Sequence, residues 1–257
     1  MSDLYLNHSS VGEGYPFIVI HGLFGSSRNW QALSKLFARH FRVITVDLRN
    51  HGDSFHAPEM SYALMAGDVL RLMDHLAIDS AHILGHSMGG KLAMKLTQLK
   101  PGRVNKLVVA DIAPVAYSHS YDDIIGPVRA MDLSVVSSRK QADNQLEKDI
   151  PDQRIRQFIL QSLTIQDGKL YWKLNWESIQ NNVAAIIGYE NIADWRIENP
   201  TQFIRGGASP YVTAQSWALI QQHFLNAELV TLDKAGHWLH AEQPAAFAEE
   251  VVRFLQG

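Results

Sequence analysis

The chain contains no cysteine. Disulfide bonds, thiolate nucleophiles, iron–sulfur clusters and cysteine-based zinc sites are therefore excluded. The chain also lacks an apolar run of about 18 residues, so no transmembrane helix is expected. Its first sixteen residues lack the basic start and apolar run of a secretory signal. We therefore expect a soluble, cytoplasmic protein with no thiol chemistry and no membrane span.

Neither sign of charge is in strong excess. The 257 residues include 23 Lys and Arg against 26 Asp and Glu, for a formal net charge of −3. A nucleic-acid-binding surface usually requires a basic excess, so no such partner is expected. Hydrophobic residues make up 46% and charged residues 19%, which is typical of a globular domain rather than a disordered tail or a coiled coil.

Short apolar runs alternate with longer amphipathic segments along much of the chain. PFIVIH at 16–21 is apolar, β-branched and followed by glycine, which predicts a buried strand. NWQALSKLFARH at 29–40 places Trp30, Leu33 and Phe37 on one helical face. Further strands are expected at 42–47, 81–86, 106–111, 201–207 and 227–233, and further helices at 62–76, 88–100, 213–224 and 244–256. Because repeated strand–helix units need right-handed crossovers, this pattern predicts an α/β fold with a largely parallel sheet and helices on both faces.

The alternation stops between residues 112 and 195. This segment is far longer than an ordinary connection, and it follows a strand end, where open α/β sheets bind ligands. We therefore expect residues 112–195 to form an inserted, mostly helical cap or lid, with 1–111 and 196–257 forming the core. Asp167-Gly168 within it predicts a tight hairpin. The alternative is a surface elaboration without a functional role.

Gly85-His86-Ser87-Met88-Gly89 fits the pattern G-x-S-x-G. The expected strand ends directly before Ser87 and the next helix begins directly after it, as in the turn that exposes a nucleophilic serine. The alternative is a glycine-rich helix start that only packs or binds phosphate. The context favours Ser87 as a nucleophile.

A serine hydroxyl needs a base to remove its proton, and twelve histidines are available. His237 stands out because it follows the last strand, at the same sheet edge as Ser87. His86 adjoins the serine in sequence, but the sharp turn directs neighbouring side chains apart. His237 and His240 are three residues apart, yet a zinc site would need further converging ligands, so no metal is expected.

The loop His21-Gly22-Leu23-Phe24-Gly25 follows the strand at 16–21 and reaches the same edge. An oxyanion hole needs two backbone amides, one directly after the nucleophile and one from such a loop. These are expected to be Met88 and Leu23, with Phe24 as the alternative to Leu23. His21 is expected to support the loop rather than to act in catalysis.

The chain resembles the α/β-hydrolases over its whole length, and more narrowly the bacterial YbfF-type esterases with a helical cap. The matching stretches are HGLFGS (21–26), DLRNHGDS (47–54), GHSMGGK (85–91), DIAPVAY (111–117), RGGASPYV (205–212) and AGHWLHAEQP (235–244). This resemblance implies an eight-stranded, mostly parallel sheet with the cap inserted after strand six. It also implies hydrolysis of acyl esters, extending to acyl-CoA thioesters.

In most α/β-hydrolases the acid that orients the histidine lies in the loop after strand seven, here residues 205–212, which contain no carboxylate. Asp111 ends the apolar run KLVVA one strand earlier, and the resemblance places the acid there. Ser209 then occupies the vacated position and is expected to add a hydrogen bond. The alternative role for Asp111 is to cap a loop.

Three more side chains near the site are assessed. Trp238 is expected to pack over His237 and shield it. Lys91, one turn after the nucleophile, could meet an anionic part of a substrate, but an ion pair with the cap or exposure to solvent is favoured. Phe158 and Trp176 are expected to line the pocket and influence the preferred acyl length. No nucleotide-binding or acidic metal motif occurs, so no cofactor is expected.

The sequence therefore favours a carboxylesterase or thioesterase that forms an acyl-enzyme on Ser87, with His237 as base, Asp111 as orienting acid and a small-molecule substrate. One alternative uses the same residues for carbon–carbon bond hydrolysis or lyase chemistry. A third is a non-catalytic receptor on the same scaffold. The oligomeric state does not follow from the sequence.

Overall fold

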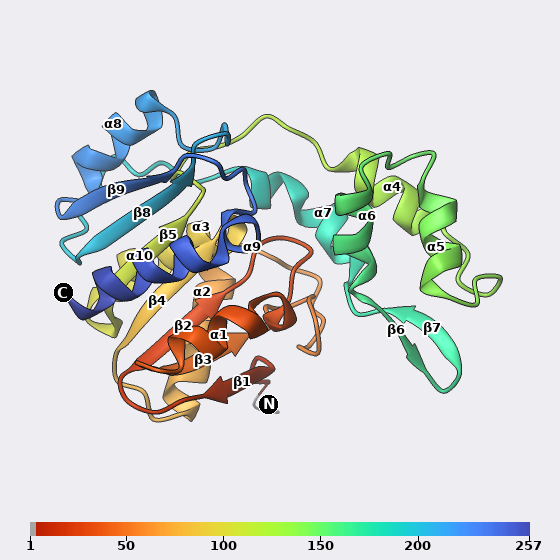
Figure 1. The fold of residues 1–257 in the computed structure, drawn as a ribbon, viewed down its shortest axis with the longest axis horizontal. Helices are drawn as coiled ribbons and strands as arrows, with labels where there is room; N and C mark the ends of the chain where they lie inside the picture. Colours follow the sequence, from red (N-terminus) through yellow and green to blue (C-terminus); the bar gives the residue numbers. More distant parts are fainter. Residues whose placement is uncertain (1–3) are drawn as a thin grey trace.

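A computed structural model describes residues 4–257. Seven strands form one sheet in the order β1-β3-β2-β4-β5-β8-β9 (Figure 1). They are β1 (His8–Val11), β2 (Pro16–Ile20), β3 (Arg42–Val46), β4 (Ala81–His86), β5 (Val104–Ala110), β8 (Thr201–Gly206) and β9 (Ala227–Leu232). All neighbours pair in parallel except β1, which runs antiparallel to β3. The predicted α/β architecture is confirmed.

The expected strand count is wrong. Within residues 4–257, seven strands pair where eight were expected, and the long insertion follows the fifth strand in chain order, β5, rather than a sixth. The strand that no apolar pattern predicted is β1, whose sequence HSSV is mostly exposed because it lies at the sheet edge. The other six strands of the sheet coincide with the predicted apolar runs.

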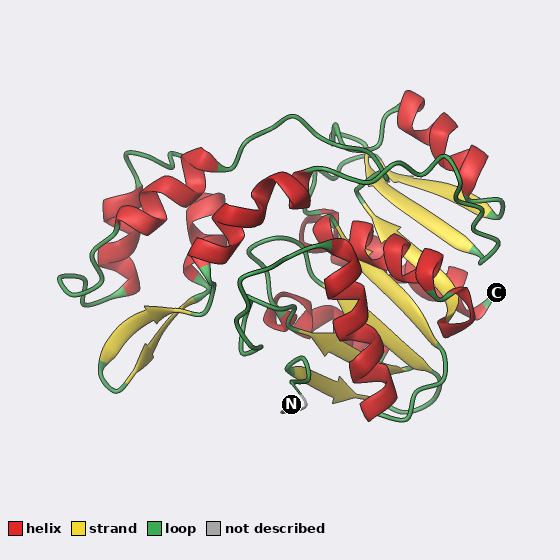
Figure 2. Cartoon of the chain, turned by 180° about the vertical axis from the view of Figure 1, so that it is seen from behind, coloured by secondary structure: helices red, strands yellow, loops and turns green. Residues whose placement is uncertain are grey.

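Alternating side chains of the central strands pack on opposite faces of the sheet, which explains why these strands are mostly apolar. On β2, Phe17 and Val19 face one core, whereas Ile18 and Ile20 face the other. The first core is covered by α1 (Gln31–Phe37) and α10 (Pro244–Gln256), and the second by α2 (Tyr62–His75), α3 (Met88–Leu99) and α8 (Ala214–His223). Figure 2 shows the sheet between these helices from behind.

The segment between β5 and β8, here called the insert, carries elements of its own. Its helices are α4 (Asp122–Ala130), α5 (Arg139–Leu146), α6 (Gln153–Leu160) and α7 (Trp176–Ile187), and β6 (Leu163–Gln166) pairs with β7 (Lys169–Trp172). Positive φ angles at Asp167 and Gly168, 52° and 75°, form the predicted tight hairpin turn. Figure 1 shows α4 to α6 and the hairpin projecting from one end of the sheet.

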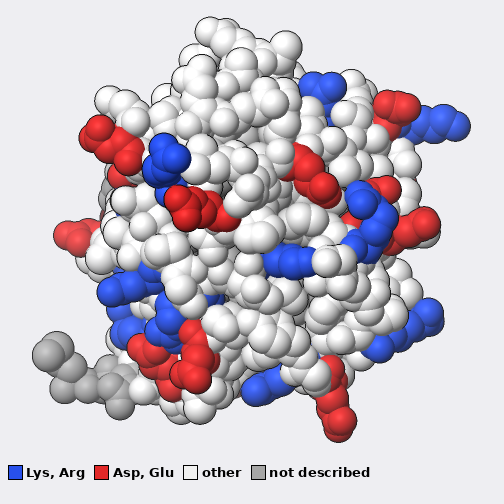
Figure 3. Space-filling model, turned by 90° about the vertical axis from the view of Figure 1, so that its left-hand side faces the viewer, with Lys and Arg blue, Asp and Glu red and all other residues white. Residues whose placement is uncertain are grey.

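Charged side chains of both signs are dispersed over the face of the molecule shown in Figure 3. This agrees with the small net charge of −3. In the part of the chain that the structure describes, no helix is long and apolar enough to cross a membrane.

Candidate active site

Ser87 lies at the sharp turn between β4 and α3, with φ 54° and ψ −120°. A non-glycine residue rarely adopts such a conformation, and residues held this way cluster at functional sites. Two glycines make the turn possible. A Cβ atom on Gly85 would lie 2.1 Å from the carbonyl oxygen of Gly89, and one on Gly89 would lie 2.5 Å from that of His21. The turn predicted from the G-x-S-x-G pattern is present.

His237 connects Ser87 to Asp111. Its Nδ1 lies 2.7 Å from Asp111 Oδ2, and its Nε2 lies 3.1 Å from Ser87 Oγ. Because a carboxylate only accepts, Nδ1 carries the proton, which leaves Nε2 free to accept from the serine hydroxyl. Asp111 is fully buried, and the side chain of His237 is 24% exposed. The three residues singled out from the sequence are therefore joined by two consecutive hydrogen bonds.

The carboxylate of Asp111 is held by the loop after β8. The Gly206 amide donates to Oδ1 at 2.9 Å, and the Ser209 hydroxyl donates to Oδ2, the oxygen that also faces His237. Asp111 itself has φ 50°, so the end of β5 bends to present the carboxylate. The hydrogen bond expected of Ser209 is present.

The loop after β2 holds the Gly22–Leu23 peptide in a fixed orientation. The Gly22 carbonyl accepts from His21 Nδ1 at 2.7 Å and from the Gly25 amide at 3.1 Å. In a trans peptide the N–H points away from the carbonyl, so these bonds also fix the direction of the Leu23 amide. The Phe24 amide is already engaged, because it donates to His51 Nε2 at 3.3 Å. This arrangement favours Leu23 over Phe24 as an oxyanion donor, with Met88 at the first turn of α3 as the second.

Two buried histidines support this loop as neutral rings. His21 Nε2 accepts from the Leu48 amide at 3.0 Å, and His51 Nδ1 donates to the Arg49 carbonyl at 2.9 Å. Burial lowers the pKa of His21 below its usual value and that of His51 to about 3. Both rings therefore remain neutral at neutral pH and can each donate and accept once. His51 was not singled out from the sequence; it stands in the stretch DLRNHGDS, and no spacing pattern indicates its contact with Phe24.

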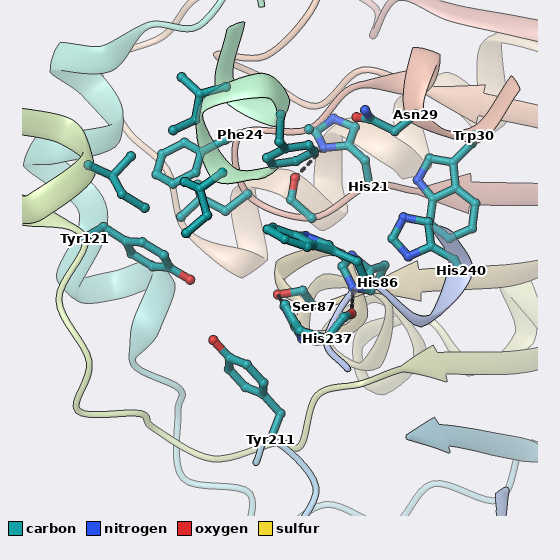
Figure 4. Close-up of a pocket in the computed structure, with 18 residues that line it drawn as sticks. His21, Phe24, Asn29, Trp30, His86, Ser87, Tyr121, Tyr211, His237 and His240 are labelled. Atoms are coloured by element: carbon teal, nitrogen blue, oxygen red, sulfur yellow. Dashed lines mark hydrogen bonds between the residues drawn. The ribbon is translucent and has the colours of Figure 1, made fainter. Parts of the chain in front are cut away.

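His86 positions the loop that carries His237. The ring of His86 donates from Nε2 to the His237 carbonyl at 2.8 Å, as the dashed line in Figure 4 marks. Burial keeps the pKa of His86 well below its usual value. As expected, His86 does not replace His237 as the partner of Ser87.

The ring stacked on His237 is Tyr211, at 4.2 Å between centroids and 27° between planes. Trp238, expected in that role, instead faces Phe158 of α6, with the ring centroids 5.7 Å apart. Trp238 still lines the site, while Tyr211, from the loop after β8, was missed. The packing of a loop residue on a distant histidine leaves no periodic signal in the sequence.

An apolar cavity of about 270 Å³ opens beside Ser87 and His237 (Figure 4). Core residues such as Leu23 and Trp238 form part of its wall, and Phe158 and Tyr121 of the insert form another part. Trp176, also expected to line the pocket, does not line this cavity and packs on the ring of Phe24, with the ring centroids 5.2 Å apart. Within residues 4–257, no group of three or more His, Asp or Glu side chains could hold a metal ion.

Comparison with known proteins gives consistent matches. The family model described as alpha/beta hydrolase fold matches residues 15–244. Esterase YbfF of Escherichia coli is 38% identical over 93% of this chain and 92% of its own length. The sn-1-specific diacylglycerol lipase ABHD11 of Danio rerio is 36% identical over 95% of this chain and 80% of its own. The solved structure of a marine microorganism esterase is 38% identical, with a TM-score of 0.95, and covers 98% of this chain and 99% of that one.

Proposed function

We propose that this chain, which belongs to the α/β-hydrolase family and is a carboxylic ester hydrolase, cleaves its substrate through an acyl-enzyme on Ser87. The observation that carries the proposal is the pair of hydrogen bonds that joins Ser87 Oγ to His237 and His237 to the buried Asp111 carboxylate. The strained backbone at Ser87 and the oriented amide of Leu23 support it.

Acylation begins when Ser87 Oγ attacks the ester carbonyl carbon while His237 Nε2 takes the hydroxyl proton. The negative charge that develops on the carbonyl oxygen is stabilised by the Leu23 and Met88 amides. The carbon–oxygen bond to the alcohol then breaks, and His237 returns the proton to the leaving oxygen. Asp111 holds the imidazole in the required tautomer and stabilises its charged form.

Deacylation repeats these steps with water as the nucleophile. His237 takes a proton from the water, the hydroxide adds to the acyl carbon, and the bond to Ser87 Oγ breaks as that oxygen regains its proton. The products are a carboxylic acid and the free enzyme. No step requires a metal or cofactor.

Acid quenching during turnover of p-nitrophenyl acetate tests the acyl-enzyme directly. Peptide mass mapping should find the acetyl group on the peptide that contains Ser87. Acetyl on another residue, with none on the Ser87 peptide, would contradict the proposal.

Hydrolysis of acyl-CoA thioesters is a further part of the proposal, because the same attack and proton return apply to a sulfur leaving group. A screen of acyl esters of increasing length beside the matching acyl-CoA thioesters would measure the preference. Turnover of neither class would contradict the assigned chemistry and favour carbon–carbon bond hydrolysis, lyase chemistry or a non-catalytic receptor.

We also propose that residues 112–195 act as a cap that selects substrates. Phe158→Ala should enlarge the apolar cavity and shift the preferred chain length, since one methylene in an apolar pocket changes discrimination by about 1–3 kcal/mol. The smallest ester should still turn over. Steady-state rates on p-nitrophenyl esters and on alkyl acetates of graded length would measure the shift.

Ile165→Ala offers a matched control, because Ile165 is also in the insert but is 64% exposed and outside the cavity. Its chain-length profile should equal that of the wild type. Identical profiles for all three proteins would show that α6 does not select the substrate.

A further inference from the structure

Five aromatic side chains form one row through the site. In order they are Trp30, His240, His86, His237 and Tyr211, all labelled in Figure 4. The centroids of successive rings lie 4.5, 4.4, 4.8 and 4.2 Å apart. The ring of His237, the proposed base, therefore lies between two other rings, those of His86 and Tyr211.

These two neighbours meet the ring of His237 in different ways. The Tyr211 ring is stacked, with 27° between the planes, so its face covers the imidazole. The His86 ring is tilted by 39°, and its Nε2 donates to the His237 carbonyl. Burial keeps the pKa of His86 well below its usual value, so this neighbour is a neutral ring. Tyr211 is therefore the side chain that interacts with the face of the His237 imidazole.

The stacked ring is held by the same segments that hold the acid. The Tyr117 hydroxyl accepts from the Ala113 amide at 3.0 Å and donates to the Tyr211 carbonyl at 2.8 Å. Ala113 follows Asp111 by two residues. Tyr117 therefore ties the segment that carries the acid to the loop that carries Tyr211. Its own ring also packs on that of Tyr211, with the centroids 5.1 Å apart.

The chemistry of the proposed reaction places a charge beneath this ring. His237 becomes positively charged when its Nε2 takes a proton, first from Ser87 and later from water. The face of an aromatic ring is electronegative, so it attracts a cation that lies over it. The attraction is stronger where water is excluded, and the His237 side chain is only 24% exposed. An interaction that is stronger in the transition state than in the ground state accelerates the reaction.

We propose that Tyr211 is a positioning residue for ester hydrolysis, whose stacked ring stabilises the charged form of His237 during both proton transfers. It acts on the face of the imidazole, whereas Asp111 acts on Nδ1 at its edge. The inference rests on the proposed function, because the charge arises only when His237 serves as the base.

The variants Tyr211→Phe and Tyr211→Leu give a first test. Phe keeps an aromatic ring and loses only the hydroxyl, whereas Leu is apolar but has no aromatic face. The kcat of Tyr211→Leu should be about three- to thirtyfold lower than that of Tyr211→Phe. Titration of the acid released from ethyl butyrate would give kcat and KM with a substrate that has no aromatic ring of its own.

Fluorination of the ring separates the electrostatic effect from packing. Phenylalanines with one, two or three ring fluorines can replace Tyr211 by nonsense suppression. They keep nearly the shape of Phe, but each fluorine withdraws electron density from the ring face. The kcat should fall with each fluorine, to about threefold or more below Tyr211→Phe in total. KM should change much less, because the neutral ester carries no charge for the ring to stabilise.

Tyr121 provides the matched control. It lines the apolar cavity and a second cavity of about 20 Å³ that also touches Ser87, and Tyr211 lines the same two cavities. Its ring packs on that of Phe24, with the centroids 5.4 Å apart, and not on His237. Trifluorophenylalanine in place of Tyr121 should therefore give the same kcat as Tyr121→Phe, whatever Tyr121→Phe itself loses relative to the wild type.

A ring that only fills space or holds its loop would give one kcat across the fluorinated series at position 211. That result, or an equal fall on fluorination at position 121, overturns the inference. Circular dichroism verifies the fold, and the fluorinated series still decides if Tyr211→Leu does not fold. Ser87→Ala, measured beside it, tests the proposed function separately. Loss of turnover in Ser87→Ala with no effect of fluorination would leave the proposed function intact, whereas wild-type turnover in Ser87→Ala would overturn both.

Discussion

Ser87→Ala is expected to lower kcat by about 10³–10⁶ while the protein remains folded. Without the hydroxyl no acyl-enzyme can form, and the remaining acceleration comes only from binding and the oxyanion amides. The methyl group of alanine fits the turn because Cβ is already present. Stopped-flow and steady-state rates on p-nitrophenyl butyrate would measure the loss, and circular dichroism would verify the fold.

Ser134→Ala controls for removal of a serine hydroxyl, since Ser134 lies exposed in the insert, outside both cavities. It should retain wild-type kcat. A fluorophosphonate should label the wild type and Ser134→Ala on Ser87, and should fail to label Ser87→Ala. Wild-type activity in Ser87→Ala, or labelling of another serine, would remove Ser87 from the mechanism.

Asp111→Asn is expected to lower kcat by about 10²–10⁴, because the amide can hold the imidazole in the wrong tautomer and cannot stabilise its charged form. Ser209→Ala should cost less than about tenfold, since a neutral hydrogen bond contributes about 0.5–1.5 kcal/mol. Asp111 Oδ2 faces His237, and the Ser209 hydroxyl donates to that same oxygen. The comparison therefore separates the effect of the carboxylate charge from that of the Ser209 hydrogen bond. Rates compared at equal folded fraction provide the measurement.

A kcat of Asp111→Asn within threefold of the wild type would mean that another group orients His237. The double variant Asp111→Asn with Ser209→Asp adds a positive test. The Ser209 hydroxyl donates to the oxygen that faces His237 Nδ1, so a carboxylate at 209 lies within reach of the same ring. Partial recovery of kcat relative to Asp111→Asn is expected.

The apolar runs in the sequence are sufficient to predict the buried strands of the sheet. β2 is buried at all but its first position, and its sequence PFIVI is continuously apolar. β4 is buried at every position, and its sequence AHILGH is apolar apart from His82 and His86. The two strands end at the turns that carry the oxyanion loop and Ser87. The apolar pattern does not predict β1, because an exposed edge strand needs no apolar face. The expected total of eight strands came from the family resemblance, whereas residues 4–7, ahead of β1, form no strand.

Local chemistry also indicated Asp111, since a carboxylate that ends an apolar strand is unusual. The contacts that hold the oxyanion loop and His237 in place could not be predicted in this way. His51 meets Phe24 across 27 residues, and Tyr211 meets His237 from a different loop. Such contacts depend on how loops pack at the sheet edge. The sequence predicts an ion pair or solvent exposure for Lys91, and this prediction is wrong for the same reason. Lys91 is buried, and its Nζ donates to the Ile187 carbonyl at the end of α7, almost a hundred residues away.

The convergence of the β5 end and the β8 loop on one imidazole has an evolutionary consequence. An ancestor or descendant of this chain could keep the acid at either place without moving the histidine. Gaining an aspartate at 209 while Asp111 remains would put two carboxylates against one ring, where their repulsion disfavours the ionised pair. Losing Asp111 first would leave the ring without an acid. Either order of substitution is therefore expected to pass through a less active enzyme.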